Sequence, residues 1–237
     1  MAPGFPKVRL SKVCLSKVCL PKVCLPILCA LFFSAFVHAQ VAPSAELTFT
    51  LDFPTSQPEH YSIRIPSDGP ARYQSSGRIS ADSDVTDSFD LDFALSAETR
   101  QKIFRLAAKA GYFQKDVASH QKGMAFTGTK TFTYKDIQRN GQSTFNYSSV
   151  SAVQELTGVL QSLAATLEFG HRLQYDHRYQ KLALDEELKR MEEMVHDNQL
   201  IEVPAIRPIL DRIIEDSTVV NMTRARAQRL LEAPNSH

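Results

Sequence analysis

The spacing of apolar residues changes along the chain, and this change constrains the fold more than any other feature. Early segments place apolar side chains at every second position, as in Leu47, Phe49 and Leu51, which is typical of a strand with one buried face. Later segments repeat them every three or four positions, which indicates amphipathic helices. The strands predicted from the early pattern cover residues 46–53, 60–65, 71–75 and 88–95, with a Ser/Asp/Gly-rich loop at residues 75–87.

A hairpin is the next predicted unit. Residues 126–137 and 143–147 flank the pair Asn140-Gly141, and such a pair accepts the positive φ angles of a type I′ turn. The aromatic side chains of Phe132, Tyr134, Phe145 and Tyr147 are expected to lie on one face of this hairpin. We therefore predict two antiparallel strands joined by a turn at Asn140-Gly141.

Helices are predicted on both sides of the hairpin and throughout the C-terminal part of the chain. Ser96 is predicted to cap a helix over residues 97–110, and Gly111 is predicted to supply its left-handed end. Ser151 is predicted to cap a second helix that Gly170 ends. The remaining helices are predicted as one long amphipathic helix over residues 171–198, a helical segment over residues 208–216, and a last helix capped by Ser217.

The order strands, helix, hairpin and helices predicts an α+β fold. We expect an antiparallel sheet with two packed helices, followed by a C-terminal helical hairpin or small bundle. The corresponding domains are a signal peptide at residues 1–39, an α+β domain at residues 40–170 and a helical C-terminal region at residues 171–237.

The first 39 residues have the pattern of a secretory signal. Five basic residues precede an apolar run over residues 25–37, and no acidic residue occurs before Glu46. Val37 and Ala39 put small side chains at the −3 and −1 positions, so cleavage is predicted between Ala39 and Gln40. A periplasmic or secreted protein is therefore expected.

Two alternatives to a cleaved signal peptide are considered for this segment. Retention as a membrane anchor is disfavoured because the apolar run covers 13 residues, residues 25–37, whereas a spanning helix needs about 20. A lipoprotein is disfavoured because Cys24 and Cys29 follow Val23 and Leu28 rather than small residues. Cleavage and retention both stay open, as does the true start codon, since the segment consists partly of repeated pentapeptides.

Cleavage would change the chemistry of the chain. The four cysteines, Cys14, Cys19, Cys24 and Cys29, all lie in the signal segment, at the spacing of its pentapeptide repeat. Their removal excludes disulfides, thiolate zinc sites and cysteine nucleophiles. The net charge of +1 falls to −4 when the five basic residues leave, so we expect neither nucleic-acid binding nor membrane attachment after cleavage.

Histidines are the first candidates for chemistry. His171 and His177 lie six positions apart near Asp176, and six residues turn a helix by about 600°, which places the two rings on opposite faces. A metal site shared by these two is not expected unless Gly170 kinks the chain. The histidines beyond the predicted cleavage site are His60, His120, His171, His177, His196 and His237.

Charged clusters are the second candidates. The run Asp82, Asp84, Asp87, Asp90 and Asp92 has the ligand type of calcium sites, but Asp87 and Phe93 stand at the sixth and twelfth positions, where an EF-hand needs Gly and Glu. An acidic stretch over residues 185–193 and a basic face over residues 223–229 are interpreted as solvated helix faces. No catalytic, cofactor-binding or metal-binding residue is predicted, and no cofactor.

The central part of the chain resembles a family of small secreted bacterial domains. The stretch from Leu95 to Phe113, the motif Thr131-Phe-Thr-Tyr134, the Asn-Gly pair and a closing helix are similar to emfourin-type inhibitors of metallopeptidases. The resemblance covers roughly residues 61–169 and implies strands, a helix ending in a Gly/Phe turn, a hairpin and a helix. The Asp/Ser-rich insertion and everything after Gly170 depart from it, and it assigns no inhibitory residue here.

The sequence therefore predicts a non-enzymatic exported protein of bacterial type that acts through protein–protein contact, with the sheet and the acidic helix as candidate surfaces. One alternative is a secreted peptidase inhibitor. Another is a periplasmic hydrolase that uses histidines and carboxylates. The hydrolase hypothesis gains if His120, His171 or His177 meets two carboxylates in one pocket.

Overall fold

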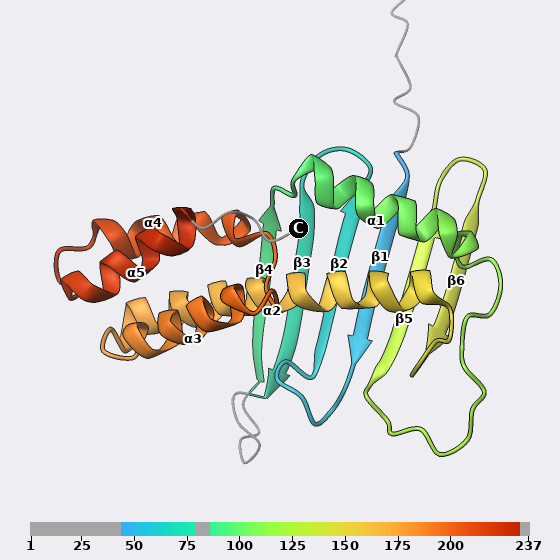
Figure 1. The fold of residues 1–237 in the computed structure, drawn as a ribbon, viewed down its shortest axis with the longest axis horizontal. Coiled ribbons are helices and arrows are strands. Elements are labelled where there is room, and N and C mark those ends of the chain that lie inside the picture. The colour runs from blue at the N-terminus through green and yellow to red at the C-terminus, as the bar shows by residue number, and fades with distance from the viewer. Residues whose placement is uncertain (1–43, 79–85, 233–237) are drawn as a thin grey trace, which may run out of the picture. The chain divides into compact units, whose positions relative to one another are not determined.

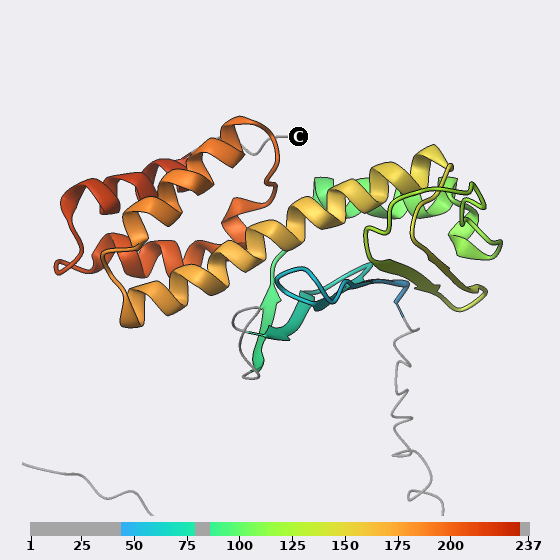
Figure 2. The same ribbon diagram turned by 90° about the horizontal axis from the view of Figure 1, so that it is seen from below.

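Six antiparallel strands form one sheet in the order β4-β3-β2-β1-β5-β6 in the computed structural model, which describes residues 44–78 and 86–232 (Figure 1). Helices α1 and α2 cover one face of the sheet, and the remaining helices pack together at the far end of α2 (Figure 2). The α+β prediction is confirmed. The strands are β1 Glu46–Asp52, β2 His60–Pro66, β3 Ala71–Arg78, β4 Thr86–Phe93, β5 Thr129–Lys135 and β6 Asn140–Phe145. The α-helices are α1 Ala97–Lys109, α2 Ser151–Tyr179, α3 Leu184–His196, α4 Arg207–Glu215 and α5 Asn221–Glu232, with 3-10 turns η1 Gly111–Phe113 and η2 Val203–Ile206.

The alternation of the early strands sets the two faces of the sheet. Leu47, Phe49 and Leu51 of β1 are buried toward the helices, and Thr48 and Thr50 lie on the opposite face. Strands β1–β4 follow one another as a meander, and β5 then pairs with the free side of β1. The four strands predicted before residue 96 are confirmed, although β3 and β4 extend into the stretch predicted as a loop.

Helix α1 begins and ends as its sequence signals indicate. The Ser96 Oγ accepts a hydrogen bond from the backbone N–H of Thr99, which satisfies one of the free donors of the first turn. Gly111 has a φ of +67° and turns the chain into η1. Ile103, Leu106 and Ala107 then face the core.

The hairpin is confirmed, but its predicted turn at Asn140-Gly141 was wrong. Asn140 pairs with Lys135 inside the ladder, and the turn lies at residues 136–139, where the Asp136 carboxylate accepts from the backbone N–H groups of Gln138 and Arg139. Gly141 serves a different purpose, because a Cβ there would lie 2.1 Å from the carbonyl oxygen of Tyr112. The glycine lets η1 approach β6.

Helix α2 continues through Gly170, so the predictions of a helix end there and of one helix over residues 171–198 were wrong. A Cβ on Gly170 would lie 2.5 Å from Cγ2 of Ile206, which shows that the glycine permits close packing between α2 and η2. The chain breaks instead between Tyr179 and Leu184. The predicted domain boundary after residue 170 consequently falls inside a continuous helix.

Two predicted caps are absent. Ser151 lies inside α2, whose N-cap is Val150 without a side-chain hydrogen bond. The last helix begins at Asn221 rather than after Ser217, because Asp216 instead accepts from the N–H and hydroxyl of Thr218 and holds the chain in a turn. In both places the serine lies one or more positions away from the position at which the helix begins.

The C-terminal helices form a small bundle with the end of α2. Leu184, Leu188 and Met191 of α3 are buried, and so are Leu210 and Ile213 of α4. The acidic stretch of α3 and the basic face of α5 neutralise each other instead of facing solvent separately. Their ion pairs join Arg226 to Asp185 and Glu192, and Arg229 to Glu192.

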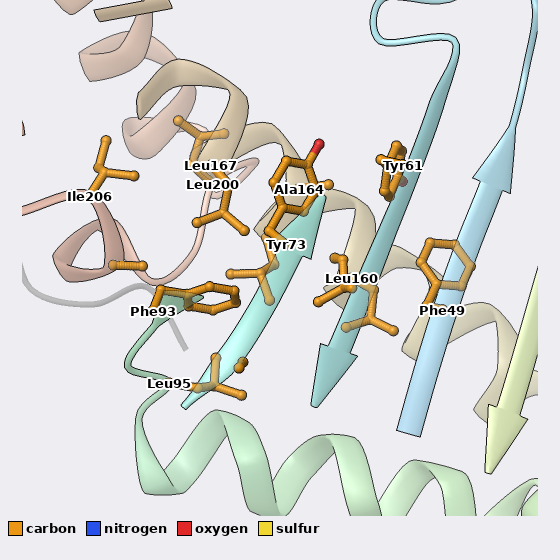
Figure 3. Close-up of a cluster of buried hydrophobic side chains, with 14 of the residues drawn as sticks. Phe49, Tyr61, Tyr73, Phe93, Leu95, Leu160, Ala164, Leu167, Leu200 and Ile206 are labelled. Carbon is orange, nitrogen blue, oxygen red and sulfur yellow. The ribbon is translucent and has the colours of Figure 1, made fainter. Parts of the chain in front are cut away.

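One hydrophobic cluster joins this bundle to the sheet. Figure 3 shows side chains of the sheet, of α2 and of the segment around η2 in a common core. Leu200 and Ile206 lie in the same cluster as Tyr73 and Phe93. The second half of α2 therefore packs against the sheet and against the segment around η2. The residues labelled there are Phe49, Tyr61, Tyr73, Phe93, Leu95, Leu160, Ala164, Leu167, Leu200 and Ile206.

Several predictions fall on residues 1–43, 79–85 and 233–237, which lie outside the described residues. These are the signal peptide with its cleavage site at Ala39 and Gln40, the four cysteines, Asp82, Asp84 and His237. Within residues 44–78 and 86–232, no helix is both long and apolar enough to cross a membrane.

Candidate functional site

A cleft of about 570 Å³ lies where the second half of α2 passes the ends of β3 and β4. Ser75 and Gly77 of β3 form one wall, and the residues of α2 from Glu168 to Tyr179 form the other. The cleft exists because α2 is continuous through Gly170, so the helix carries charged and aromatic residues past the sheet.

Glu168 is a carboxylate at the base of the cleft. The Tyr73 hydroxyl donates to its Oε1 at 2.7 Å and the Ser75 hydroxyl donates at 2.6 Å. Burial opposes its ionisation, but the polar contacts of His171, Ser75 and Tyr73 outweigh burial and hold the pKa of Glu168 below its ordinary value. The same burial, together with the nearby Glu168 charge, raises the pKa of Tyr73 and keeps its hydroxyl a donor.

His171 lies between two carboxylates. Its Nε2 is 3.2 Å from Oδ2 of Asp87, and its Nδ1 is 3.6 Å from Oε2 of Glu168. The imidazole ring stacks on Phe89 with 4.4 Å between centroids and an interplanar angle of 8°. One of the three named histidines thus meets two carboxylates in one cleft, which is the arrangement that the hydrolase hypothesis requires.

The chemistry open to this group is limited by how its atoms are paired. Each ring nitrogen of His171 faces a carboxylate, so a ligand would have to displace Asp87 or Glu168 to reach either nitrogen. The ring also stands between the carboxylates, so they do not converge on one point. In the part of the chain that the structure describes, no three His, Cys, Asp or Glu side chains are arranged to hold a metal ion.

Aromatic side chains form the outer part of the cleft. Tyr175 is 52% exposed and Tyr179 is 61% exposed, with 5.1 Å between their ring centroids. Asp176 lies between them in the chain, and burial, followed by the charge of Glu187, raises its pKa despite the attraction of Arg172. This rim offers two tyrosine rings and a carboxylate to a ligand.

Three other histidines form separate contacts. His60 pairs with Asp52, His120 with Asp116, and His177 lies 3.0 Å from Oδ2 of Asp216. His171 and His177 therefore have different partners, as their spacing predicts. The Asp216 carboxylate also binds Lys181, and the hydrogen bonds from Lys181 and Thr218 hold its pKa well below the ordinary value.

The aspartates considered as calcium ligands divide between the two faces of β4. Asp90 and Asp92 pair with Arg72 on the sheet face away from the helices, whereas Asp87 contacts His171 on the helix side. Alternate strand positions point in opposite directions, so these three carboxylates cannot surround one ion.

Sequence reasoning missed Glu168, Tyr73 and Ser75 as members of the site. One signal was present, because Glu168 follows Leu160 and Ala164 at intervals of four and therefore lies on the apolar face of α2. A carboxylate on that face requires polar partners in the core. Its partners on β3 could not be read from the sequence, since they lie more than 90 positions away.

A Glu168→Gln variant is expected to lose about 2 kcal/mol of unfolding free energy at neutral pH, as charge-assisted hydrogen bonds are lost. Because the folded-state pKa of Glu168 is lowered, the ionised form stabilises the fold above the ordinary Glu range. That stabilisation disappears as the pH falls through the folded-state value, so wild type and variant should converge in acid. Urea unfolding at several pH values measures the difference.

The control for this variant is Glu155→Gln, which changes an exposed carboxylate of the same helix. It should follow the wild type within about 0.5 kcal/mol at every pH, as is usual for surface positions. If the unfolding free energies of Glu168→Gln and the wild type differ by a constant amount down to acid pH, the assigned hydrogen bonds are contradicted.

A scan against protein-family models gives no match, and a search of curated protein sequences gives none either.

Proposed function

We propose that this is an exported, non-enzymatic protein that acts by contacting another protein, and that its contact surface is the cleft bordered by α2, β3 and β4. The observation that carries the proposal is the exposure of Tyr175 and Tyr179 at the rim of that cleft. Tyrosine is among the residues that contribute most to binding when a partner covers them. The paired state of His171 and Glu168 supports a binding role, since both side chains are already used within the fold.

Exchange of both rim tyrosines for serine tests the proposal. The Tyr175→Ser/Tyr179→Ser variant should lower the affinity for a partner captured by the wild-type protein from periplasm or culture medium at least tenfold, because two anchor side chains are lost. Tyr147→Ser is the matched control, since Tyr147 is 40% exposed beside β6, away from the cleft. Equal capture by all three proteins would contradict the proposal.

The resemblance to emfourin-type inhibitors makes secreted metallopeptidases the first partners to test. If the protein is a peptidase inhibitor, equimolar purified protein should suppress the activity of at least one enzyme of a metallopeptidase panel, and the rim double variant should not. Full activity of every enzyme at equimolar protein would contradict the inhibitor hypothesis and leave other protein partners open.

Hydrolysis is the second candidate function, and a specific observation favours it. His171, Asp87 and Glu168 share one cleft, as a general acid–base site would require. Wild-type turnover of chromogenic esters or glycosides that a His171→Gln variant abolishes would establish this function. Hydrolysis by the wild-type protein no faster than in buffer alone would contradict this function.

A further inference from the structure

Among the described residues, no strand pairs with the outer edge of β4. β4 stands at one end of the sheet order, and β3 is its strand partner. No backbone–backbone hydrogen bond outside that pairing involves Thr86–Phe93 within the described residues, although the Ser88 N–H donates to the Asp87 carboxylate. Every second residue of an edge strand points its N–H and C=O groups outward, so β4 offers a row of backbone groups for strand pairing.

Helix α2 extends beyond this edge. It contacts β3 through Glu168 and β4 through His171, and Tyr175 and Tyr179 follow four and eight residues later. These steps correspond to about 6 and 12 Å along a helix axis, whereas neighbouring strands lie about 4.8 Å apart. Figures 1 and 2 show α2 continuing past β4. Steps of seven and eleven residues return to nearly the same side of a helix, so Tyr175 and Tyr179 share the face of Glu168, and the spacing places them over the position that an added strand would take.

The charge of this edge favours a basic partner. β4 contains Asp87, Asp90 and Asp92 and no basic residue, and Asp176 adds a carboxylate on the overhanging helix. Arg172 of the helix is paired with Glu187, and Arg72 of β3 is the cation between Asp90 and Asp92, so the carboxylates around this edge still outnumber its cations. A second copy of β4 would bring like charges together, which is destabilising across a strand pair.

The overhanging rings suit the same partner. Tyr175 and Tyr179 can receive a Lys or Arg side chain on their faces, where a cation is attracted by the ring electrons. Arg178, the chain neighbour of Tyr179, lies 5.2 Å from the centroid of this ring and would compete there with a partner's cation. Side chains on the helix-facing side of an added strand would meet these rings and Asp176.

We propose that the partner binds by strand addition: an extended basic segment pairs with the outer edge of β4, and its Lys or Arg side chains lie against Tyr175, Asp176 and Tyr179. Backbone hydrogen bonds would supply affinity, and the acidic, aromatic overhang would select the side chains. This inference rests on the proposed function and adds the mode of binding and the chemistry of the partner.

Three synthetic octapeptides test the inference with the protein containing residues 40–237. One alternates Val and Lys, the second carries Pro in place of a central Val, and the third alternates Val and Glu. Fluorescence anisotropy should show saturable binding of the Val-Lys peptide, with the other two at least tenfold weaker. Pro removes a donor from the added ladder, and Glu meets like charges.

Hydrogen exchange locates the binding. Addition of the Val-Lys peptide should slow amide exchange in Thr86–Phe93 at least tenfold, because outward N–H groups become paired. Asp176→Asn should weaken the peptide at least threefold, whereas Glu193→Gln, an exposed carboxylate on α3, should leave its affinity unchanged.

Three results would overturn strand addition. They are no saturable binding up to about 1 mM peptide, equal binding of the Pro or Glu peptide, or unchanged exchange in β4. The two proposals fail separately. If the tyrosine double variant loses a captured partner while that partner leaves exchange in β4 unchanged, the contact surface stands and strand addition falls.

Discussion

A Gly141→Ala variant is expected to unfold with a free energy about 3 kcal/mol lower than that of the wild type. The added Cβ would lie 2.1 Å from the carbonyl oxygen of Tyr112 and 2.9 Å from the carbonyl carbon of Phe113. Both neighbours are backbone atoms, so no side-chain rotation relieves the overlap, and either β6 or η1 must move. Tyr112 and Phe113 already hold φ angles of +55° and +58°, which leaves that turn little freedom to adapt.

The matched control is Gly158→Ala in α2. Beyond the backbone of its own helical turns, no described atom lies within 4 Å of a Cβ built at Gly158, and alanine is favoured over glycine inside a helix by about 1 kcal/mol. Urea unfolding should therefore move in opposite directions for the two variants. Wild-type stability of Gly141→Ala would contradict the close packing of η1 on β6.

A Glu202→Ala variant is expected to have an unfolding free energy about 3 kcal/mol lower than the wild type, because three donors lose their buried acceptor. The Glu202 carboxylate accepts from the backbone N–H and the hydroxyl of Ser96 and from the hydroxyl of Thr99. It thereby joins the segment before η2 to the first turn of α1, more than 100 positions away. Glu202 is buried and has a φ of +57°, so its placement is specific.

Two further variants define the cause of this loss. Glu202→Gln keeps one oxygen acceptor and should lose less stability than Glu202→Ala. Glu193→Ala removes an exposed carboxylate and should stay within about 0.5 kcal/mol of the wild type. If Glu202→Ala matches Glu193→Ala in thermal unfolding, the carboxylate does not join the bundle to α1.

The strands and α1 could be predicted because their signals are local. Alternation along β1 reports its buried face directly, and Ser96 caps α1 through a residue only three positions away. Such short-range patterns need no knowledge of the partner element. The predicted α+β class follows from their order and is confirmed.

The main prediction errors concerned glycines, because tertiary packing rather than local backbone conformation requires a glycine at these positions. Gly141 and Gly170 were interpreted through backbone conformation, as a turn and a helix end, whereas each makes room for an atom of a distant segment. Gly111, by contrast, does hold a positive φ and was predicted correctly. A sequence shows that a glycine is present, but the atom approaching it becomes visible only in the fold.

The candidate site was predictable only in part, for the same reason. His171 was recognised as a residue type suited to chemistry. Its neighbour Glu168 lies three positions earlier on the same helix, whereas its neighbour Asp87 lies far away in the sequence, on β4. The stripe of Tyr175, Tyr179 and Leu182 was visible as helical spacing and was interpreted as part of an amphipathic helix. The structure leaves it exposed, because the bundle packs on other faces of α2.

Site-specific photo-crosslinking in cells that produce the protein is the most direct test of the contact surface. A photoreactive phenylalanine analogue in place of Tyr179 should form a covalent adduct with a partner protein, and the same analogue in place of Tyr147 should form none. Both positions hold exposed tyrosines, so reactivity alone does not separate them. A partner adduct at position 147 together with none at position 179 would contradict the proposal that the cleft bordered by α2, β3 and β4 is the contact surface.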